Sequence, residues 1–113
     1  MKKVLIVEDE PQQIIAYQRK FGVMFNLLVA QNGRDGLEVA RKEHPDLIIL
    51  DVVLPGDFNG FEILDELKVG QQTSDIPVMI VTNLDRDQKQ LALEKGAIDF
   101  IVKTDISLDG LLG

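Results

Sequence analysis

Short runs of apolar residues alternate along this chain with segments whose apolar residues recur at helical spacing. Five of the runs are rich in Val, Ile and Leu, as strands are. Three are almost continuously apolar, which is typical of strands buried on both faces of a parallel sheet, and the second is mixed and is expected at an edge. In chain order, we predict strands at Lys3–Val7, Asn26–Ala30, Asp46–Leu50, Pro77–Thr82 and Asp99–Val102.

The segments between the strands carry helix start and stop signals. Proline is tolerated in the first turn of a helix, and glycine is common just after the last turn. On these signals we predict helices from Pro11 to about Phe21, from Asn32 or Gly33 to just before Pro45, and from about Phe61 to Val69. Asp85 and Gln88 resemble a capping box for a fourth helix that ends at Gly96. A short fifth helix is expected to begin near Ser107.

Strands that alternate with helices predict an α/β fold with a parallel sheet. We expect a single domain over residues 1–113 with a flavodoxin-like, doubly wound topology. This topology has five parallel strands in the order 2-1-3-4-5 and flanking helices, here with a short last helix. The carboxyl ends of all the strands then lie at one edge of the sheet, where ligands bind, and the first and third strands are neighbours.

Polar residues stand at the carboxyl ends of four predicted strands. Glu8 and Asp9 follow the first strand, Asp51 follows the third, Thr82 ends the fourth, and Lys103 follows the fifth. The predicted topology sends these side chains to one edge of the sheet and places Asp9 beside Asp51. Carboxylates crowded in this way raise one another's pKa, and a hard divalent cation removes that cost.

We therefore predict a magnesium site, with manganese as an alternative metal, at this edge. Asp9 and Asp51 fit the role of direct ligands, Glu8 can act through a water, and the backbone carbonyl of Val53 can complete the set. Asp51 can also be a nucleophile that forms an aspartyl phosphate. Lys103 and Thr82 would then contact phosphoryl oxygens, because phosphoryl transfer mainly requires positioning and charge neutralisation.

Composition narrows the classes of partner. The net charge of −7 argues against direct binding to nucleic acid or to an anionic membrane surface, and it suits capture of a cation. The chain has no cysteine, so a reducing, cytoplasmic setting is expected. No apolar stretch approaches the ~20 residues of a membrane span.

The polar residues and their flanking segments resemble the response-regulator receiver domains of two-component signalling. The resemblance covers essentially the whole chain, and its elements occur in order at compatible spacing. They are Val-Glu8-Asp9-Glu, Leu-Ile-Ile-Leu-Asp51-Val-Val-Leu-Pro55, Val-Thr82 and Phe100-Ile-Val-Lys103.

The resemblance implies a phosphorylation switch. Asp51 would accept a phosphoryl group from a sensor histidine kinase or a histidine phosphotransferase, with Glu8, Asp9 and Asp51 as the metal site. Lys103 would contact the phosphoryl group, and Thr82 and Phe100 would be the switch pair that changes the surface of the fourth helix, fifth strand and fifth helix. Such a protein is not a turnover enzyme, although it assists its own phosphorylation and dephosphorylation.

Three positions depart from the family pattern. The loop from Asp51 to Gly60 is one residue longer than usual, and Thr104 replaces the proline that usually follows the conserved lysine. Asn83 replaces the small residue that commonly follows the conserved threonine. We expect Asn83 to alter the rate of autodephosphorylation.

Other functions on the same fold fit less well. A flavin phosphate would be repelled by the acidic loop after the first strand, and a phosphatase of the haloacid-dehalogenase type needs an acid where Val53 stands. A receiver-like interaction module that is never phosphorylated is the main alternative. Independently of this, Phe100 fits an ordinary core residue as well as a switch residue. Dimerisation through the fourth helix, fifth strand and fifth helix is compatible with the sequence.

Overall fold

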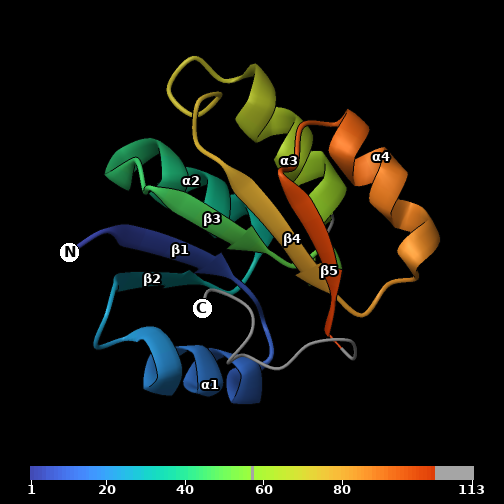
Figure 1. The fold of residues 1–113 in the computed structure, drawn as a ribbon. Coiled ribbons are helices and arrows are strands. Elements are labelled where there is room, and N and C mark those ends of the chain that lie inside the picture. Colours follow the sequence, from blue (N-terminus) through green and yellow to red (C-terminus); the bar gives the residue numbers. More distant parts are fainter. Residues whose placement is uncertain (57, 104–113) are drawn as a thin grey trace.

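The computed structural model describes residues 1–56 and 58–103. Its five strands form a single parallel sheet in the order β2-β1-β3-β4-β5, which confirms the predicted fold class and strand order (Figure 1). The mixed second strand lies at an edge, as predicted. The strands are β1 (Lys3–Val7), β2 (Asn26–Ala30), β3 (Leu47–Leu50), β4 (Val78–Thr82) and β5 (Asp99–Val102).

Four α-helices are present in this part of the chain. In Figure 1, α1 covers one face of the sheet, and α2, α3 and α4 cover the other. A short 3₁₀ turn, η1, leads into α4. The bounds are α1 (Pro11–Phe21), α2 (Gly33–Glu43), α3 (Gly60–Val69), η1 (Arg86–Gln88) and α4 (Lys89–Glu94). The predicted fifth helix near Ser107 and the Lys103–Thr104 peptide lie outside the described residues.

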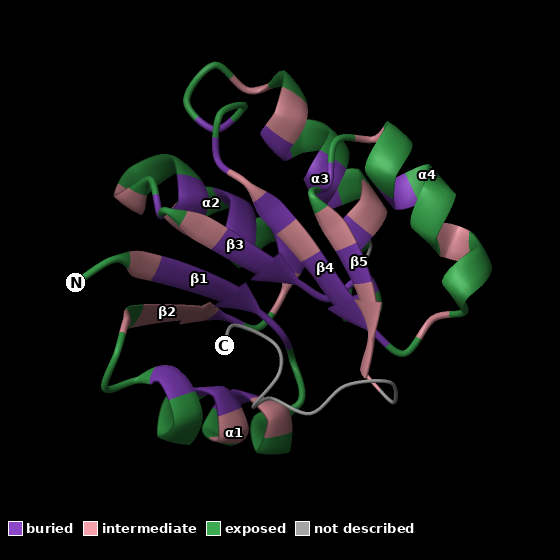
Figure 2. Cartoon of the chain, viewed as in Figure 1, coloured by how far each residue is buried: buried purple, intermediate pink, exposed green. Residues whose placement is uncertain are grey.

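Alternate residues of the buried strands point into two separate cores. In β1, Val4 and Ile6 pack with Tyr17 and Phe21 of α1. Leu5 and Val7 point to the opposite face, where they join the larger core beneath α2, α3 and α4. Figure 2 shows the buried residues concentrated in the strands and on the helix sides that face the sheet. Two-sided burial explains why these strands are almost wholly apolar.

One helix-start prediction is wrong. Asp85 precedes η1, but its side chain makes no capping hydrogen bond. The capping box lies instead at the start of α3, where the Asn59 side chain accepts from the Glu62 amide and the Glu62 side chain accepts from the Asn59 amide. Glu10 occupies the N-cap position of α1, also without a side-chain bond. No helix among the described residues is long and apolar enough to cross a membrane.

Candidate functional site

The register of the strands brings the predicted site residues together at one edge of the sheet. Val7 of β1 pairs with Leu50 of β3, so that Glu8 and Asp51 leave neighbouring strands at the same level. The Asp51 amide donates to the Val7 carbonyl at 3.0 Å, which fixes this level. Across β4 and β5, Thr82 pairs with Val102, and Lys103 follows at once.

Asp51 is 7% exposed, and its carboxylate accepts hydrogen bonds from three sides. Its Oδ1 accepts from the Thr82 hydroxyl at 2.8 Å and from the Val53 amide at 3.0 Å. Its Oδ2 accepts from the Lys103 ammonium at 2.9 Å. Donors from β4, from the β3–α3 loop and from the end of β5 therefore hold this carboxylate in one orientation.

The buried Glu8 carboxylate connects the other side of the site to the start of α1. Its Oε1 accepts from the Lys103 ammonium. Its Oε2 accepts from the backbone amides of Asp9 at 3.1 Å and Glu10 at 3.3 Å, two donors just before the helix. Glu8 thus fixes the turn that presents the exposed Asp9 and also helps to position Lys103.

The electrostatics of the site follow from the burial of two carboxylates beside one ammonium. Burial raises the pKa of Glu8 and the charge of Asp51 raises it further, against the opposing effect of Lys103. Burial by itself lowers the pKa of Lys103, but its hydrogen bonds to Glu8 and Asp51 and their charges outweigh burial and raise it. The three groups together carry an excess negative charge, which a cation would neutralise.

The carboxylates at this edge are chemically the kind of ligand that a hard divalent cation prefers. Glu8, Asp9 and Asp51 offer only oxygen ligands, which suit Mg²⁺ or Mn²⁺. The residues that the structure describes contain no ready-made group of three metal-binding side chains. Lys103 bridges Glu8 and Asp51, and it balances part of the charge that a metal would balance.

The remaining predicted residues lie around this centre. Phe100 is 4% exposed and belongs to the larger core. Val53 is exposed and directs its amide, not its side chain, at Asp51. Asn83 is exposed immediately after Thr82. The structure therefore joins the side chains of Glu8, Asp51, Thr82 and Lys103 by direct hydrogen bonds, with the Val53 amide added, while Phe100 is a core residue.

Sequence reasoning missed the relation of Tyr17 to this site. Tyr17 is 2% exposed on the sheet-facing side of α1. Burial raises the pKa of its hydroxyl, and the charges of Glu8 and Asp51 raise it further. In the sequence Tyr17 has the spacing of an ordinary core residue of a helix, so no local signal indicated its proximity to two carboxylates.

Comparison with known proteins assigns the family. A profile of the response regulator receiver domain matches residues 4–111. The chain belongs to this family. Receiver domains of this kind are signalling switches of two-component systems, not conventional enzymes, and phosphorylation is typical of them.

Three relatives illustrate the match. Protein PilH of Pseudomonas aeruginosa is 39% identical over 107 residues, 91% of this chain and 86% of PilH. The N-terminal receiver domain of Klebsiella pneumoniae RstA, solved in a BeF3-activated form, is 34% identical, with a TM-score of 0.80 over 90% of this chain and 86% of that one. The transcriptional regulatory protein PhoP of Bacillus subtilis is 36% identical over 90% of this chain, which spans only 42% of PhoP.

Proposed function

We propose that this receiver domain is a phosphorylation switch in which Asp51 accepts the phosphoryl group. The observation that carries the proposal is the convergence of Lys103 and Thr82 on the Asp51 carboxylate, next to the buried Glu8. The phosphoryl donor is a sensor histidine kinase or a histidine phosphotransferase. We place the reaction in the cytoplasm, where such a donor and a divalent metal are both available.

In the proposed reaction a carboxylate oxygen of Asp51 forms a bond to phosphorus while the bond between phosphorus and the donor's histidine nitrogen breaks. The nitrogen keeps the bonding electron pair and takes up a proton. The Lys103 ammonium and the Thr82 hydroxyl, both already bound to Asp51, are in place to stabilise charge on the phosphoryl oxygens. The protein thus supplies positioning and charge in place of acid–base chemistry.

A divalent metal, Mg²⁺ or Mn²⁺, would be held by Asp9, Asp51 and the Val53 carbonyl, with Glu8 acting through a water. When bound, it neutralises negative charge on the carboxylates and on the incoming phosphoryl group. Glu8 and Lys103 prepare the site by fixing the turn that carries Asp9 and by orienting Asp51.

Phosphorylation would be read through Thr82 and Phe100. The hydroxyl of Thr82 would follow a phosphoryl oxygen, and the ring of Phe100 would adjust to the space beside it, changing the surface around α4 and β5. A small change in the free-energy difference between the two conformations is sufficient to shift their populations if both are already populated before phosphorylation. Replacement of Thr82 by Ala is expected to leave phosphorylation largely intact, because Lys103 and the metal would still neutralise the phosphoryl charge, and to weaken binding of a downstream target.

The test is intact-mass spectrometry of the protein incubated with acetyl phosphate, with and without Mg²⁺. Wild type is compared with Asp51→Asn and with Asp87→Asn, which makes the same change at an exposed acid of η1. We expect a metal-dependent gain of ~80 Da, one HPO₃, in wild type and in Asp87→Asn, and none in Asp51→Asn.

An unchanged mass in wild type, sampled fast enough to catch a short-lived acyl phosphate, would contradict the proposal. It would favour the alternative of an interaction module that works without phosphorylation. A gain of mass that persists in Asp51→Asn would show that another residue accepts the phosphoryl group.

A further inference from the structure

Strand β2 forms one edge of the sheet and presents backbone groups on its outer side. The Asn26 amide donates to the Lys2 carbonyl, on the side of β1. In a parallel ladder, successive residues turn their amide and carbonyl to opposite sides of the strand, so Leu27 and Val29 turn theirs away from β1. In the part of the chain that the structure describes, β2 pairs with β1 alone, which leaves these groups of Leu27 and Val29 unpaired.

The two edges of the sheet differ in how they are protected against pairing with another strand. Edge strands usually carry charged residues, proline or a bulge for this purpose. The opposite edge strand, β5, begins with Asp99, whose Oδ1 lies 3.7 Å from the Lys89 Nζ of α4. The sequence of β2 is Asn-Leu-Leu-Val-Ala, with no charged residue, proline or glycine, and its pairing with β1 is unbroken from Asn26 to Ala30. β2 is therefore the less protected edge, open to a further strand.

A second copy of β2 in antiparallel orientation fits this edge. With a two-fold axis at Leu28, the Leu27 of each copy would exchange a pair of amide–carbonyl hydrogen bonds with the Val29 of the other. The two Leu28 residues would face each other as a non-hydrogen-bonded pair, in which side chains approach most closely. Leu28 is partly buried against the larger core beneath α2, so this contact would extend that core across the interface. Two-fold symmetry of this kind is the commonest arrangement of homo-oligomers.

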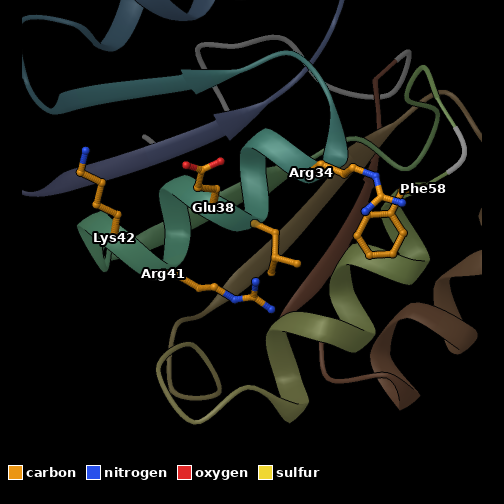
Figure 3. Close-up of a pocket in the computed structure, with 6 residues that line it drawn as sticks. Arg34, Glu38, Arg41, Lys42 and Phe58 are labelled. Carbon is orange, nitrogen blue, oxygen red and sulfur yellow. The ribbon is translucent and has the colours of Figure 1, made fainter.

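Two exposed charges of α2 lie beside this edge. A groove of about 490 Å³ between β2 and α2 has Val29 and Ala30 of the strand and Glu38 and Lys42 of the helix in its lining. Figure 3 shows Glu38 and Lys42 on the same side of α2, away from Arg41. Both are exposed, and among the described residues neither has an ion-pair partner. An acid and a base are therefore free to bind charges that a second chain brings to the groove.

The order of these two charges is complementary to itself under the same two-fold axis. α2 connects two parallel strands, β2 and β3, so it runs back along β2. Lys42 therefore lies nearer to the start of β2 than Glu38 does, by about one helical turn. In the antiparallel arrangement the start of one β2 faces the end of the other. The Glu38 of each copy would then meet the Lys42 of the other.

We propose that the β2 edge, together with the adjoining side of α2, is a dimer interface between two copies of this chain. The backbone groups, the central leucine and the two charges all match a second copy in one arrangement. One strand and one side of a helix make a small interface, so the dimer is weak and depends on concentration. The interface is at the opposite edge of the sheet from β5, and the proposal does not depend on phosphorylation of Asp51.

The test is sedimentation equilibrium of the wild type, Glu38→Lys, Lys42→Glu and an equimolar mixture of these two variants, over roughly 10 µM to 1 mM protein. Each variant alone places like charges opposite each other, whereas the mixture restores opposite charges at both positions. The matched controls are Glu94→Lys, Lys89→Glu and their mixture, which make the same changes at exposed residues of α4, beside the other edge. Thermal melting checks that every variant remains folded.

We expect a reversible dimer of the wild type. The dissociation constant should rise about tenfold or more in each α2 variant alone and return to within about threefold of the wild-type value in their mixture. The α4 variants and their mixture should stay within about twofold of wild type. A wild type that is monomeric at every concentration, α2 variants that dimerise as well as wild type, or a mixture that does not recover would overturn the proposal. Equal effects in the α4 series would overturn it in favour of another interface.

Amide hydrogen exchange of the wild type, followed by nuclear magnetic resonance, tests the backbone pairing directly. The amides of Leu27 and Val29 should exchange more slowly at high protein concentration than at low concentration, because they become bonded only in the dimer. The Leu28 amide faces β1 and serves as the internal control, with exchange that does not depend on concentration. Exchange of Leu27 and Val29 that is equally fast at both concentrations would rule out pairing through β2.

Discussion

At the scale of the residue, the hydrogen bond between Thr82 and Asp51 makes a prediction about stability, in which the longer contact from the Leu84 amide to the Thr82 hydroxyl, 3.4 Å, is lost as well. Thr82 is fully buried and donates to Asp51 Oδ1 at 2.8 Å. The substitution Thr82→Val keeps the volume and removes the donor, and Oδ1 still accepts from the Val53 amide. We expect a loss of about 1–2 kcal/mol in the free energy of unfolding, measured with urea and without metal.

A double-mutant cycle with Asp51→Asn separates this bond from other effects of the Val side chain. The two changes should be non-additive by roughly 1 kcal/mol, because either one removes or weakens the same bond. Strictly additive losses would show that the contact contributes nothing to stability.

Tyr17 makes a prediction about alkaline pH. The pKa of its hydroxyl is raised by burial and by the charges of Glu8 and Asp51, so the folded state favours the neutral form. This contribution to stability is fully present below the ordinary pKa of about 10 and is lost as the pH rises above it. The chain has one tyrosine and no tryptophan, so tyrosinate absorbance reports on Tyr17 alone.

In an alkaline titration, we expect tyrosinate absorbance to appear at the same pH as unfolding. Unfolding is measured by circular dichroism on the same samples. The substitution Tyr17→Phe should shift alkaline unfolding to higher pH. Ionisation of Tyr17 near pH ~10 in a folded chain would contradict the assigned burial and charge environment.

At the scale of the element, the residues that precede α3 and η1 differ in how much their side chains should contribute to stability. Asn59 accepts from the Glu62 amide at 3.0 Å at the start of α3, whereas Asp85 caps nothing with its side chain. The substitution Asn59→Ala should therefore cost about 1 kcal/mol of unfolding free energy. Asp85→Ala should change it by less than about 0.5 kcal/mol, and a larger loss at Asp85 than at Asn59 would reverse the assignment.

The β3–α3 loop is the element that the sequence described least well. Its extra residue relative to the family pattern was visible in the spacing of Asp51 and Gly60. Its contacts were not: Gly60 packs so closely that a Cβ would lie 2.3 Å from the Val52 Cα, and Phe58 supports Arg34. The first contact closes the loop on itself over eight residues, and the second joins residues 24 positions apart, so neither follows from the periodicity of a strand or helix.

At the scale of the whole molecule, the proposed switch predicts stabilisation by a phosphoryl analogue. A ligand that binds only the folded state stabilises it by an amount that grows with the logarithm of its concentration, about 2.7 kcal/mol at a hundredfold excess over Kd. Beryllium fluoride with Mg²⁺ at such an excess should therefore raise the melting temperature by roughly 10 °C or more, since 1 kcal/mol corresponds to about 4–8 °C for a domain of ~100 residues.

The shift should require both beryllium fluoride and Mg²⁺, and it should disappear in Asp51→Asn but persist in Asp87→Asn. An equal shift in Asp51→Asn would indicate binding elsewhere. It would leave the acceptor role of Asp51 without support from this measurement.

The sequence by itself determined the architecture and predicted that Glu8, Asp51, Thr82 and Lys103 meet at one edge of the sheet, as they do. Uninterrupted apolar runs specify buried strands, and helix signals fall between them. Because the strands are parallel, their carboxyl ends all lie at one edge of the sheet. The five predicted strands are all present, with two starting one residue later than expected, at Leu47 and Val78. These features follow from local patterns, whose physical cause is the periodicity of burial along each element.

Only the tertiary structure decided how the site residues are bonded. Lys103 bridges Glu8, 95 residues away, and Asp51, 52 residues away, and Glu8 also binds two backbone amides at the start of α1. A sequence can bring a carboxylate and an ammonium to the same edge of a sheet, but it does not state which oxygen accepts from which donor. That choice depends on side-chain packing and on the backbone register across β1, β3, β4 and β5, which is established only in the folded sheet.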